Sequence, residues 1–175
     1  AQLILSARNV EKLNELKESL QHKEQHLVVQ VDLADTSNVG DFAKQIVSHY
    51  GRIDVLINNG GISQRATAYD TTMEVNRQIM EVNFFGNIAM TKAVLPIFRQ
   101  QKSGQILVIS SIAGKFGFHL RSAYSASKHA LFGYYESLVM EESAYHLKVT
   151  VACPGKINTP ISTNAVTAEG KAHGQ

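Results

Sequence analysis

Short apolar runs rich in β-branched residues recur along the chain and predict strands near residues 3–7, 27–31, 55–57, 106–109 and 149–152. None alternates between polar and apolar positions, and continuous apolar runs are typical of strands buried on both faces of a parallel sheet. Stretches with helical periodicity lie between them, near residues 10–20, 42–47, 72–101 and 122–146. Alternation of strand and helix predicts right-handed βαβ units, and so an α/β domain spanning residues 1–175.

Composition narrows the class of protein. Of 175 residues, 44% are hydrophobic and 18% are charged, which is enough apolar material for a core. Basic and acidic residues are nearly balanced, and a net charge of +2 is too small to indicate a nucleic-acid partner. No apolar run is long enough to span a membrane. A single cysteine, Cys153, fits a reducing compartment. We therefore expect a cytoplasmic protein, with membrane attachment through a segment before Ala1 left open.

Candidate chemistry is centred on Tyr124 and Lys128, which are four residues apart in a helical stretch and so share one face. A phenol is a poor acid or base at neutral pH, but a nearby lysine cation favours the phenolate. Such a pair alone is weak evidence, because most chance matches are solvated surface pairs. Ser111 adds to it, since it ends the apolar run QILVIS at the sheet edge where α/β proteins bind ligands. On its position relative to Tyr124 alone, Ser111 could equally be one of two turn-forming residues, together with Ser110.

Three other features follow or interrupt predicted elements. The run Asn58–Gly61 (NNGG) follows a strand, where small residues allow the backbone to approach a flat ligand, although an ordinary turn has the same composition. Asn83 lies inside a long helical stretch, where asparagine is a poor helix former. It therefore either points to solvent or distorts the helix. Pro154 and Gly155 follow the last strand.

Taken together, NNGG, Asn83, ISS, YSASK and PGKINT occur in an order and spacing that resembles the classical short-chain dehydrogenase/reductase family, over nearly the whole chain. The stretches RSAYSASKHA and PGKINTPISTNAVTAEG look most like its member-7B-like branch, which is related to hydroxysteroid dehydrogenases. The resemblance implies a Rossmann-like, doubly wound parallel sheet in three α/β/α layers. It also implies a nicotinamide cofactor bound across the carboxyl edge of that sheet.

Site roles are carried over from the resemblance residue by residue. It implies that Tyr124 is the general acid/base, that Lys128 assists it and holds the ribose, that Ser111 orients the substrate, and that Asn83 holds a water for proton relay. The implied cofactor contacts are Asp32 and Leu33 at the adenine, Asn59, Gly60 and Gly61 along the adenosine half, and Pro154, Gly155, Ile157 and Thr159 at the nicotinamide, besides Tyr124 and Lys128. Asp32 could equally be a turn or capping aspartate. The family needs no metal, and the sequence has no metal-ligand spacing.

Arg8 decides which cofactor we expect. It follows the first predicted strand, where a carboxylate would accept the 2′-hydroxyl of NAD and a guanidinium would pair with the 2′-phosphate of NADP. The sequence therefore favours NADP(H) over NAD(H), although a surface arginine before a helix is the alternative.

Two departures from the family pattern are visible. Gly60 replaces the usual alanine of N-N-A-G, and this should cost about 0.5–1 kcal/mol of loop rigidity. The family's first strand and glycine-rich turn do not occur in this sequence, which begins in the counterpart of the second strand. We therefore expect an incomplete sheet, with a gap or an altered pairing between strands 3–5 and 55–57, and no activity from these 175 residues alone.

Function is thus expected to be reversible hydride transfer between NADP(H) and a small apolar carbonyl or secondary alcohol. Phe116, Phe118 and residues 161–175, expected to be a mobile substrate loop, suggest the apolar pocket. The rival readings are a non-catalytic dinucleotide-binding or scaffold protein and an inactive truncated product. Apolar residues on more than one face of helices 72–101 and 122–146 predict a homodimer or homotetramer.

Overall fold

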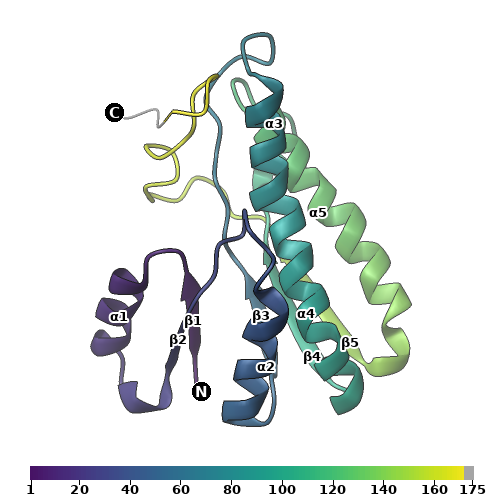
Figure 1. The fold of residues 1–175 in the computed structure, drawn as a ribbon. Helices are drawn as coiled ribbons and strands as arrows, with labels where there is room; N and C mark the ends of the chain where they lie inside the picture. Colours follow the sequence, from purple (N-terminus) through teal and green to yellow (C-terminus); the bar gives the residue numbers. More distant parts are fainter. Residues whose placement is uncertain (172–175) are drawn as a thin grey trace.

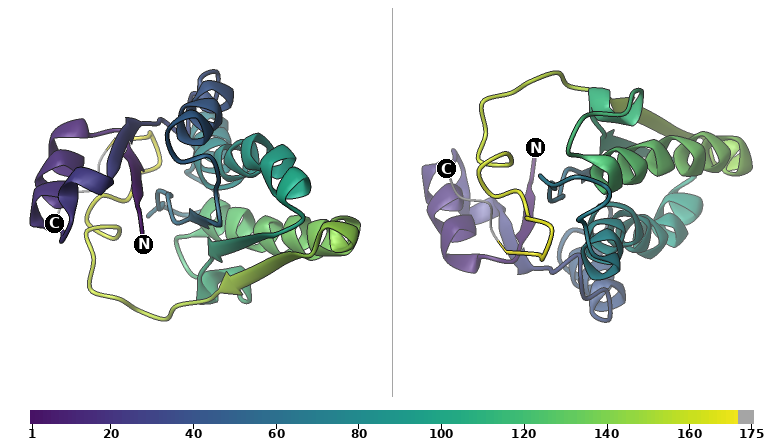
Figure 2. Two further views of the ribbon diagram at one scale, coloured as in Figure 1. Left: turned by 90° about the horizontal axis from the view of Figure 1, so that it is seen from below. Right: turned by 90° about the horizontal axis from the view of Figure 1, so that it is seen from above.

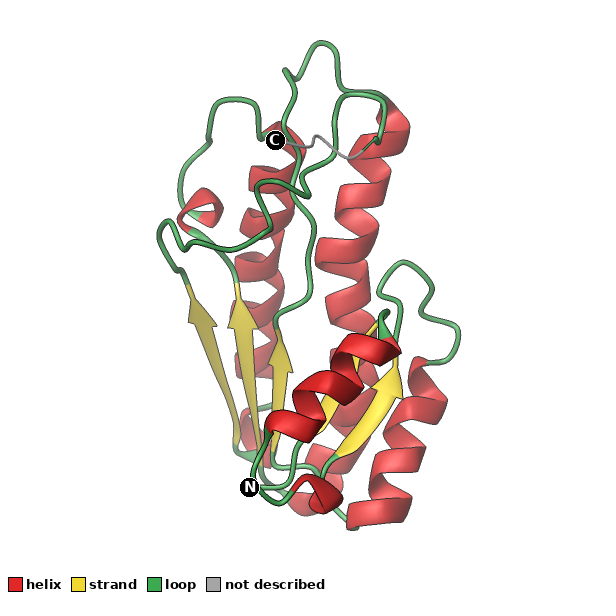
Figure 3. Ribbon diagram, turned by 90° about the vertical axis from the view of Figure 1, so that its left-hand side faces the viewer, coloured by secondary structure: helices red, strands yellow, loops and turns green. Residues whose placement is uncertain are grey.

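The computed structural model describes residues 1–171 and contains two parallel sheets that are not hydrogen-bonded to each other (Figures 1 and 3). One sheet pairs β1 (Ile4–Ala7) with β2 (Leu27–Gln30). The other has the order β3 (Val55–Asn58), β4 (Gly104–Ile109), β5 (Leu147–Ala152). The α/β class and its parallel strands are confirmed. The gap expected between β1 and β3 is also present, because these strands belong to different sheets.

Helices connect the strands as the periodicity predicted. They are α1 (Val10–Ser19), α2 (Val39–Tyr50), α3 (Met73–Met80), α4 (Gly86–Gln101) and α5 (Ser122–Glu141). Asn9 caps α1 by accepting the Lys12 N–H through its side chain, as its position before the helix predicts. Thr72 caps α3 in the same manner.

The predicted long helix is interrupted at Asn83. Residues Glu81–Phe85 form a π-helical turn between α3 and α4, and Asn83 within it is fully buried. Of the two alternatives for this asparagine, helix distortion is therefore correct. Such turns cost backbone regularity and often occur at functional positions, because they aim a side chain inward.

Burial of the strands on both faces was predicted, and for β3 this is wrong. Leu56 and Asn58 are buried beneath helices, whereas Val55 and Ile57 on the opposite face are 49% and 58% exposed. The core lies on one side only, where side chains from α2, α4 and α5 pack on β3, β4 and β5. Among residues 1–171, no helix covers the other face, so the apolar run is not sandwiched there (Figure 3).

The segment after β5 arcs away from the three-stranded sheet toward the β1–β2 unit in both views of Figure 2. Within the expected substrate loop, Ala165 and Val166 are buried, and Val166 forms a parallel bridge with Gln64. Residues 172–175 of that loop lie outside the described residues. Mobility of the loop stays a prediction, but its middle is anchored to the chain that follows β3.

Candidate functional site

A cavity of about 260 Å³ lies between the two sheets, at their carboxyl ends. It brings together Arg8 after β1, Asp32 and Leu33 after β2, and the loop after β3 from Asn59 to Gly61. All six were predicted to contact the adenosine half of a cofactor. A second, smaller cavity of about 160 Å³ also contains Arg8 and Asp32, so the guanidinium of Arg8 borders both.

Gly60 is explained by its neighbour Leu33. A Cβ atom on Gly60 would lie 2.4 Å from Cδ1 of Leu33, so the leucine occupies the space that the family's alanine methyl would need. The backbone of Leu33 also approaches Gly86 closely, because a Cβ atom there would lie 2.5 Å from the Leu33 carbonyl oxygen. The wall of the cavity is therefore packed by a leucine against two glycines.

Lys128 is buried on α5 and reaches the sheet. Its ammonium donates to the Ile109 carbonyl oxygen at 2.8 Å, at the end of β4. Burial lowers the pKa of Lys128 from 10.5 to about 8. Its Nζ lies 5.8 Å from the ring centroid of Tyr124, which is buried one turn earlier on the same helix. The predicted sharing of a helix face is thus seen, and at neutral pH the lysine is still a cation.

Gly61 connects this pair to the cavity. A Cβ atom at Gly61 would lie 3.1 Å from Oδ1 of Asn83 and 3.6 Å from Nζ of Lys128. Because Gly61 lines the cavity while Asn83 and Lys128 do not, these two side chains lie behind the cavity wall that Gly61 forms.

Asn83 holds the loop after β3 through paired hydrogen bonds. Its amide donates to the Ile62 carbonyl at 2.9 Å and to Oγ of Ser127 at 3.0 Å, and its oxygen accepts the Ile62 N–H at 2.8 Å. Both amide hydrogens are therefore used. Its direct partners are protein atoms, and its role in a water-mediated relay stays a prediction.

Ser111 lies at the carboxyl end of β4, where its hydroxyl accepts the Ala113 N–H at 3.1 Å and caps the short helix η3 (Ile112–Gly114). Both readings of this residue are thus compatible, since a capping hydroxyl that accepts one bond still has its own hydrogen to donate. Ser110 is buried and donates to the Lys128 carbonyl at 3.1 Å, which ties the strand end to α5.

The predicted nicotinamide contacts are not gathered with the others. Pro154 is half-buried, Gly155 and Thr159 are exposed, and Ile157 is 60% exposed. None of these four lines the main cavity. They follow β5 at the same sheet edge, so their assignment rests on position in the fold alone.

A buried polar cluster beneath the site was not anticipated. The amide of Asn58 donates to the hydroxyls of Tyr135 at 2.7 Å and Thr91 at 3.0 Å, and to the Asn87 carbonyl at 3.3 Å. Burial raises the pKa of Tyr135 to about 12. The amide of Asn87 in turn donates to the Gly60 carbonyl at 3.4 Å, so the cluster supports the NNGG loop. Asn58 is 29–77 residues away from these three partners in the sequence, and no local pattern reveals such contacts.

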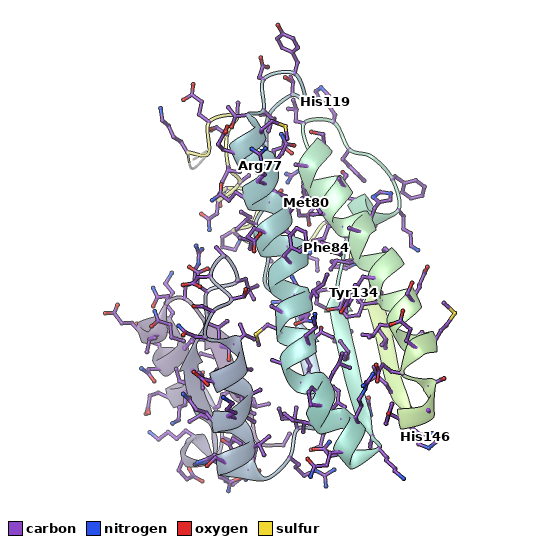
Figure 4. The ribbon with its side chains drawn as sticks, turned by 45° about the vertical axis from the view of Figure 1, so that its right-hand side comes forward. Arg77, Met80, Phe84, His119, Tyr134 and His146 are labelled. Atoms are coloured by element: carbon purple, nitrogen blue, oxygen red, sulfur yellow. The ribbon has the colours of Figure 1, made fainter. Side chains whose placement is uncertain are left out.

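Further contacts exist on the outer surface of α5 and the π turn. Figure 4 shows Phe84 and Tyr134 facing each other from neighbouring helices, with ring centroids 6.2 Å apart and edge-on. Within residues 1–171, no cluster of side chains suits a metal ion, and no helix is both long and apolar enough to cross a bilayer.

Comparison with known proteins agrees with this geometry. A family model described as short chain dehydrogenase matches residues 1–170. The chain is 46% identical to mouse dehydrogenase/reductase SDR family member 7B, over 99% of its own length and 55% of the mouse protein. It is 39% identical to a Drosophila melanogaster SDR family protein 7-like, over 99% and 55% of the two lengths. The chain therefore spans little more than half of these relatives.

Solved structures give the same fold. A short-chain dehydrogenase from Streptomyces avermitilis superposes with a TM-score of 0.85 at 32% identity, covering 94% of this chain and 60% of that one. ElxO with NADP bound superposes with a TM-score of 0.82 at 28% identity, covering 87% and 62% of the chains. The family-model match, these relatives and these solved structures together show that the chain belongs to the short-chain dehydrogenase/reductase family, in the branch that resembles member 7B.

Proposed function

We propose that the protein carrying this chain is an NADP(H)-dependent oxidoreductase that interconverts a carbonyl compound and a secondary alcohol. One observation carries the proposal: Lys128 is buried beside Tyr124 and next to Gly61, and Gly61 lines a cavity built by the expected adenosine contacts. A binding module has no need for a buried lysine next to a tyrosine at this position. Desolvation of the lysine costs stability, and catalysis gives it a reason to be retained.

The cavity residues fit a dinucleotide. Gly60 and Gly61 leave the backbone open to a flat ligand, and the exposed Arg8 borders both cavities without a carboxylate partner among residues 1–171. A guanidinium there suits the 2′-phosphate of NADP. Among structural neighbours, ElxO binds NADP and a xylitol dehydrogenase binds NAD⁺, so NAD(H) is the alternative that affinity measurements must separate. The nicotinamide, when bound, would supply or accept the hydride.

The chain's own residues would handle the proton. In reduction, Tyr124 donates its phenolic proton to the carbonyl oxygen of the substrate, and in oxidation it takes that proton back. Lys128 would assist Tyr124 as a neighbouring cation and would hold the ribose hydroxyls. Ser111, at the end of β4, donates its hydroxyl hydrogen to the substrate oxygen and so orients the substrate. Asn83 would continue the relay from Lys128 through a water.

Substrate and assembly follow from exposed apolar groups at the same end and on the helices. Phe116 is 68% exposed and Phe118 is 42% exposed in the loop before α5, which suits a small apolar substrate.

Phe85 is half exposed beside the Phe84–Tyr134 contact, whereas Leu131 and Tyr135 belong to the core. This outer face, formed by the π turn before α4 and by α5, is our proposed interface for a homodimer or homotetramer. A cytoplasmic location remains part of the proposal.

The test is Tyr124→Phe in the full-length protein, assayed by NADPH consumption with an aromatic diketone, benzil. Removal of one hydroxyl should lower turnover by about 10²–10⁴-fold, while NADPH affinity and the melting temperature change little. A variant that keeps near-normal turnover on a substrate the parent reduces would refute the assigned chemistry. Equal turnover of NADH and NADPH would refute the cofactor preference alone.

A further inference from the structure

Gln64 is a fully buried polar side chain outside both the predicted cofactor contacts and the proposed catalytic set. It lies in the loop after β3, three residues beyond Gly61. A buried amide without partners would cost about 1–3 kcal/mol, so its hydrogen bonds need an account. They lead to the first turn of α5, where Tyr124 lies.

The amide of Gln64 satisfies the start of α5 from outside that helix. Its Oε1 accepts the Ala123 N–H at 2.9 Å, and its Nε2 donates to Oγ1 of Thr71 at 2.6 Å. Thr71 directs its own hydrogen to the Thr67 carbonyl, so it can only accept from Gln64, and this fixes which way the amide points. The residue before α5, Arg121, provides no side-chain cap. Gln64 therefore takes the place of the missing local cap.

The loop that carries Gln64 is itself held from several sides. Asn83 pairs with the backbone of Ile62, and Arg121 donates to the hydroxyl of the buried Ser63. The backbone of Val166 bonds to Ser63 and to Arg65 on the other side. Because the contacts made by Asn83 and Val166 come from outside α5, the loop that carries Gln64 has support that does not depend on this helix.

Tyr124 is the residue next to Ala123, so a shift of the first turn of α5 moves the phenol relative to Lys128 and Gly61. Resting on the proposed function, we propose that Gln64 is a positioning residue, which fixes the first turn of α5 and thereby sets the place of the Tyr124 hydroxyl. It links the loop after β3 to the first turn of α5, so the proposed cofactor contacts and the Tyr124 hydroxyl are held in a fixed relative position. Small displacements of a catalytic group can cost about 10²-fold in rate.

The chain offers a matched control in Gln101, at the end of α4. Its amide also bonds to backbone, accepting the Ile53 N–H at 3.1 Å and donating to the Ile53 carbonyl at 2.6 Å. Ile53 precedes β3, so Gln101 is at the amino edge of the sheet, opposite the site. Replacing either glutamine by leucine removes comparable hydrogen bonds, but only one of them touches α5.

Gln64→Leu, Gln101→Leu and Tyr124→Phe should be compared in the full-length protein with NADPH and benzil. We expect kcat to fall about 10–100-fold in Gln64→Leu, with the KM for NADPH within about twofold. Gln101→Leu should lose similar thermal stability and keep its kcat. Amide hydrogen exchange without any ligand provides a second readout, with exchange at Ala123 and Tyr124 about tenfold faster in Gln64→Leu only.

The inference is overturned if kcat of Gln64→Leu falls no further than that of Gln101→Leu, or if the Ala123 amide is equally protected in both. Its failure is distinct from failure of the proposed function. Loss of turnover in Tyr124→Phe with normal Gln64→Leu rejects the positioning role only, whereas normal Tyr124→Phe turnover rejects the assigned chemistry. If benzil is not reduced by the parent, the exchange comparison alone decides the positioning role.

Discussion

The two sheets hold their polar groups in opposite surroundings. In the three-stranded unit, the important groups are buried: Lys128, Asn83, Gln64 and the cluster around Asn58 all have side-chain or backbone partners. In the β1–β2 unit, Leu13 and His26 are the buried side chains among residues 1–30, and Arg8 is exposed. The packed unit thus offers the fixed geometry that the proposed proton transfer would need. The open unit offers an exposed arginine, which would be enough for the proposed recognition of a phosphate.

The largest expected effect comes from breaking the packed unit at Asn58. Asn58→Leu removes the donor to Tyr135, Thr91 and Asn87 and leaves buried acceptors without it, so the free energy of unfolding should fall by about 3–5 kcal/mol. Chemical denaturation measures it. Asn9→Ala, which removes the α1 cap in the open unit, should cost only about 1 kcal/mol. Equal losses would contradict the contrast between the units.

Next in size is the pH dependence that Lys128 imposes on stability. Its pKa is lowered by burial from 10.5 to about 8, so the unfolded chain binds this proton more tightly than the folded one. Lys128 therefore destabilises the fold below pH 8, and the penalty disappears as the pH rises from about 8 to 10.5. The ligand-free parent should gain up to about 3 kcal/mol over this interval relative to Lys128→Met.

Denaturation curves of parent and variant at both ends of that interval measure the difference, and subtraction removes the titration of shared groups. Lys148→Met, at an exposed position on β5, is the control and should retain the pH dependence. If Lys128→Met shows the same pH dependence as the parent, Lys128 does not titrate as its burial requires.

A smaller effect is expected in the open unit at Arg8. Arg8→Leu should weaken NADPH binding about tenfold, or about 1.4 kcal/mol, and leave NADH binding nearly unchanged, because the guanidinium would serve the 2′-phosphate only. Titration calorimetry of both cofactors checks this. Arg52→Leu, which removes an exposed arginine paired with Asp54 before β3, is the matched control. If Arg8→Leu weakened NADPH and NADH binding equally, Arg8 would support the structure of the β1–β2 unit and would not bind the 2′-phosphate.

The smallest effect concerns the contact between the units. Gly60→Ala should cost about 1 kcal/mol, because Leu33 fills the space of the added methyl. In a Leu33→Ala background the same change should become neutral or stabilising, since alanine restricts the unfolded chain more than glycine. A double-mutant cycle on unfolding free energies gives the coupling. Zero coupling would show that the leucine moves away freely.

Much of this molecule could be predicted from local pattern. Strand and helix positions follow from apolar runs and their periodicity, because those signals arise within one element. The proximity of Tyr124 and Lys128 follows from their four-residue spacing on a helix. Arg8, Asp32 and the Asn59–Gly61 loop each follow the carboxyl end of a parallel strand, and the two sheets direct these ends to one cavity. The distortion at Asn83 was foreseeable as one of two alternatives, from its poor helix propensity.

Other features were decided only by tertiary structure, because they depend on residues that are distant in the chain. The Asn58–Tyr135 bond joins positions 77 apart, and the Gln64–Ala123 bond joins positions 59 apart, so neither leaves a periodic signal. The exposure of Val55 and Ile57 depends on what covers the sheet, which an apolar run cannot specify. Gly60 looked like a loss of rigidity until Leu33 was seen to fill its place. Local sequence determines which elements form and which groups they carry, whereas packing determines how closely and in what surroundings those groups meet.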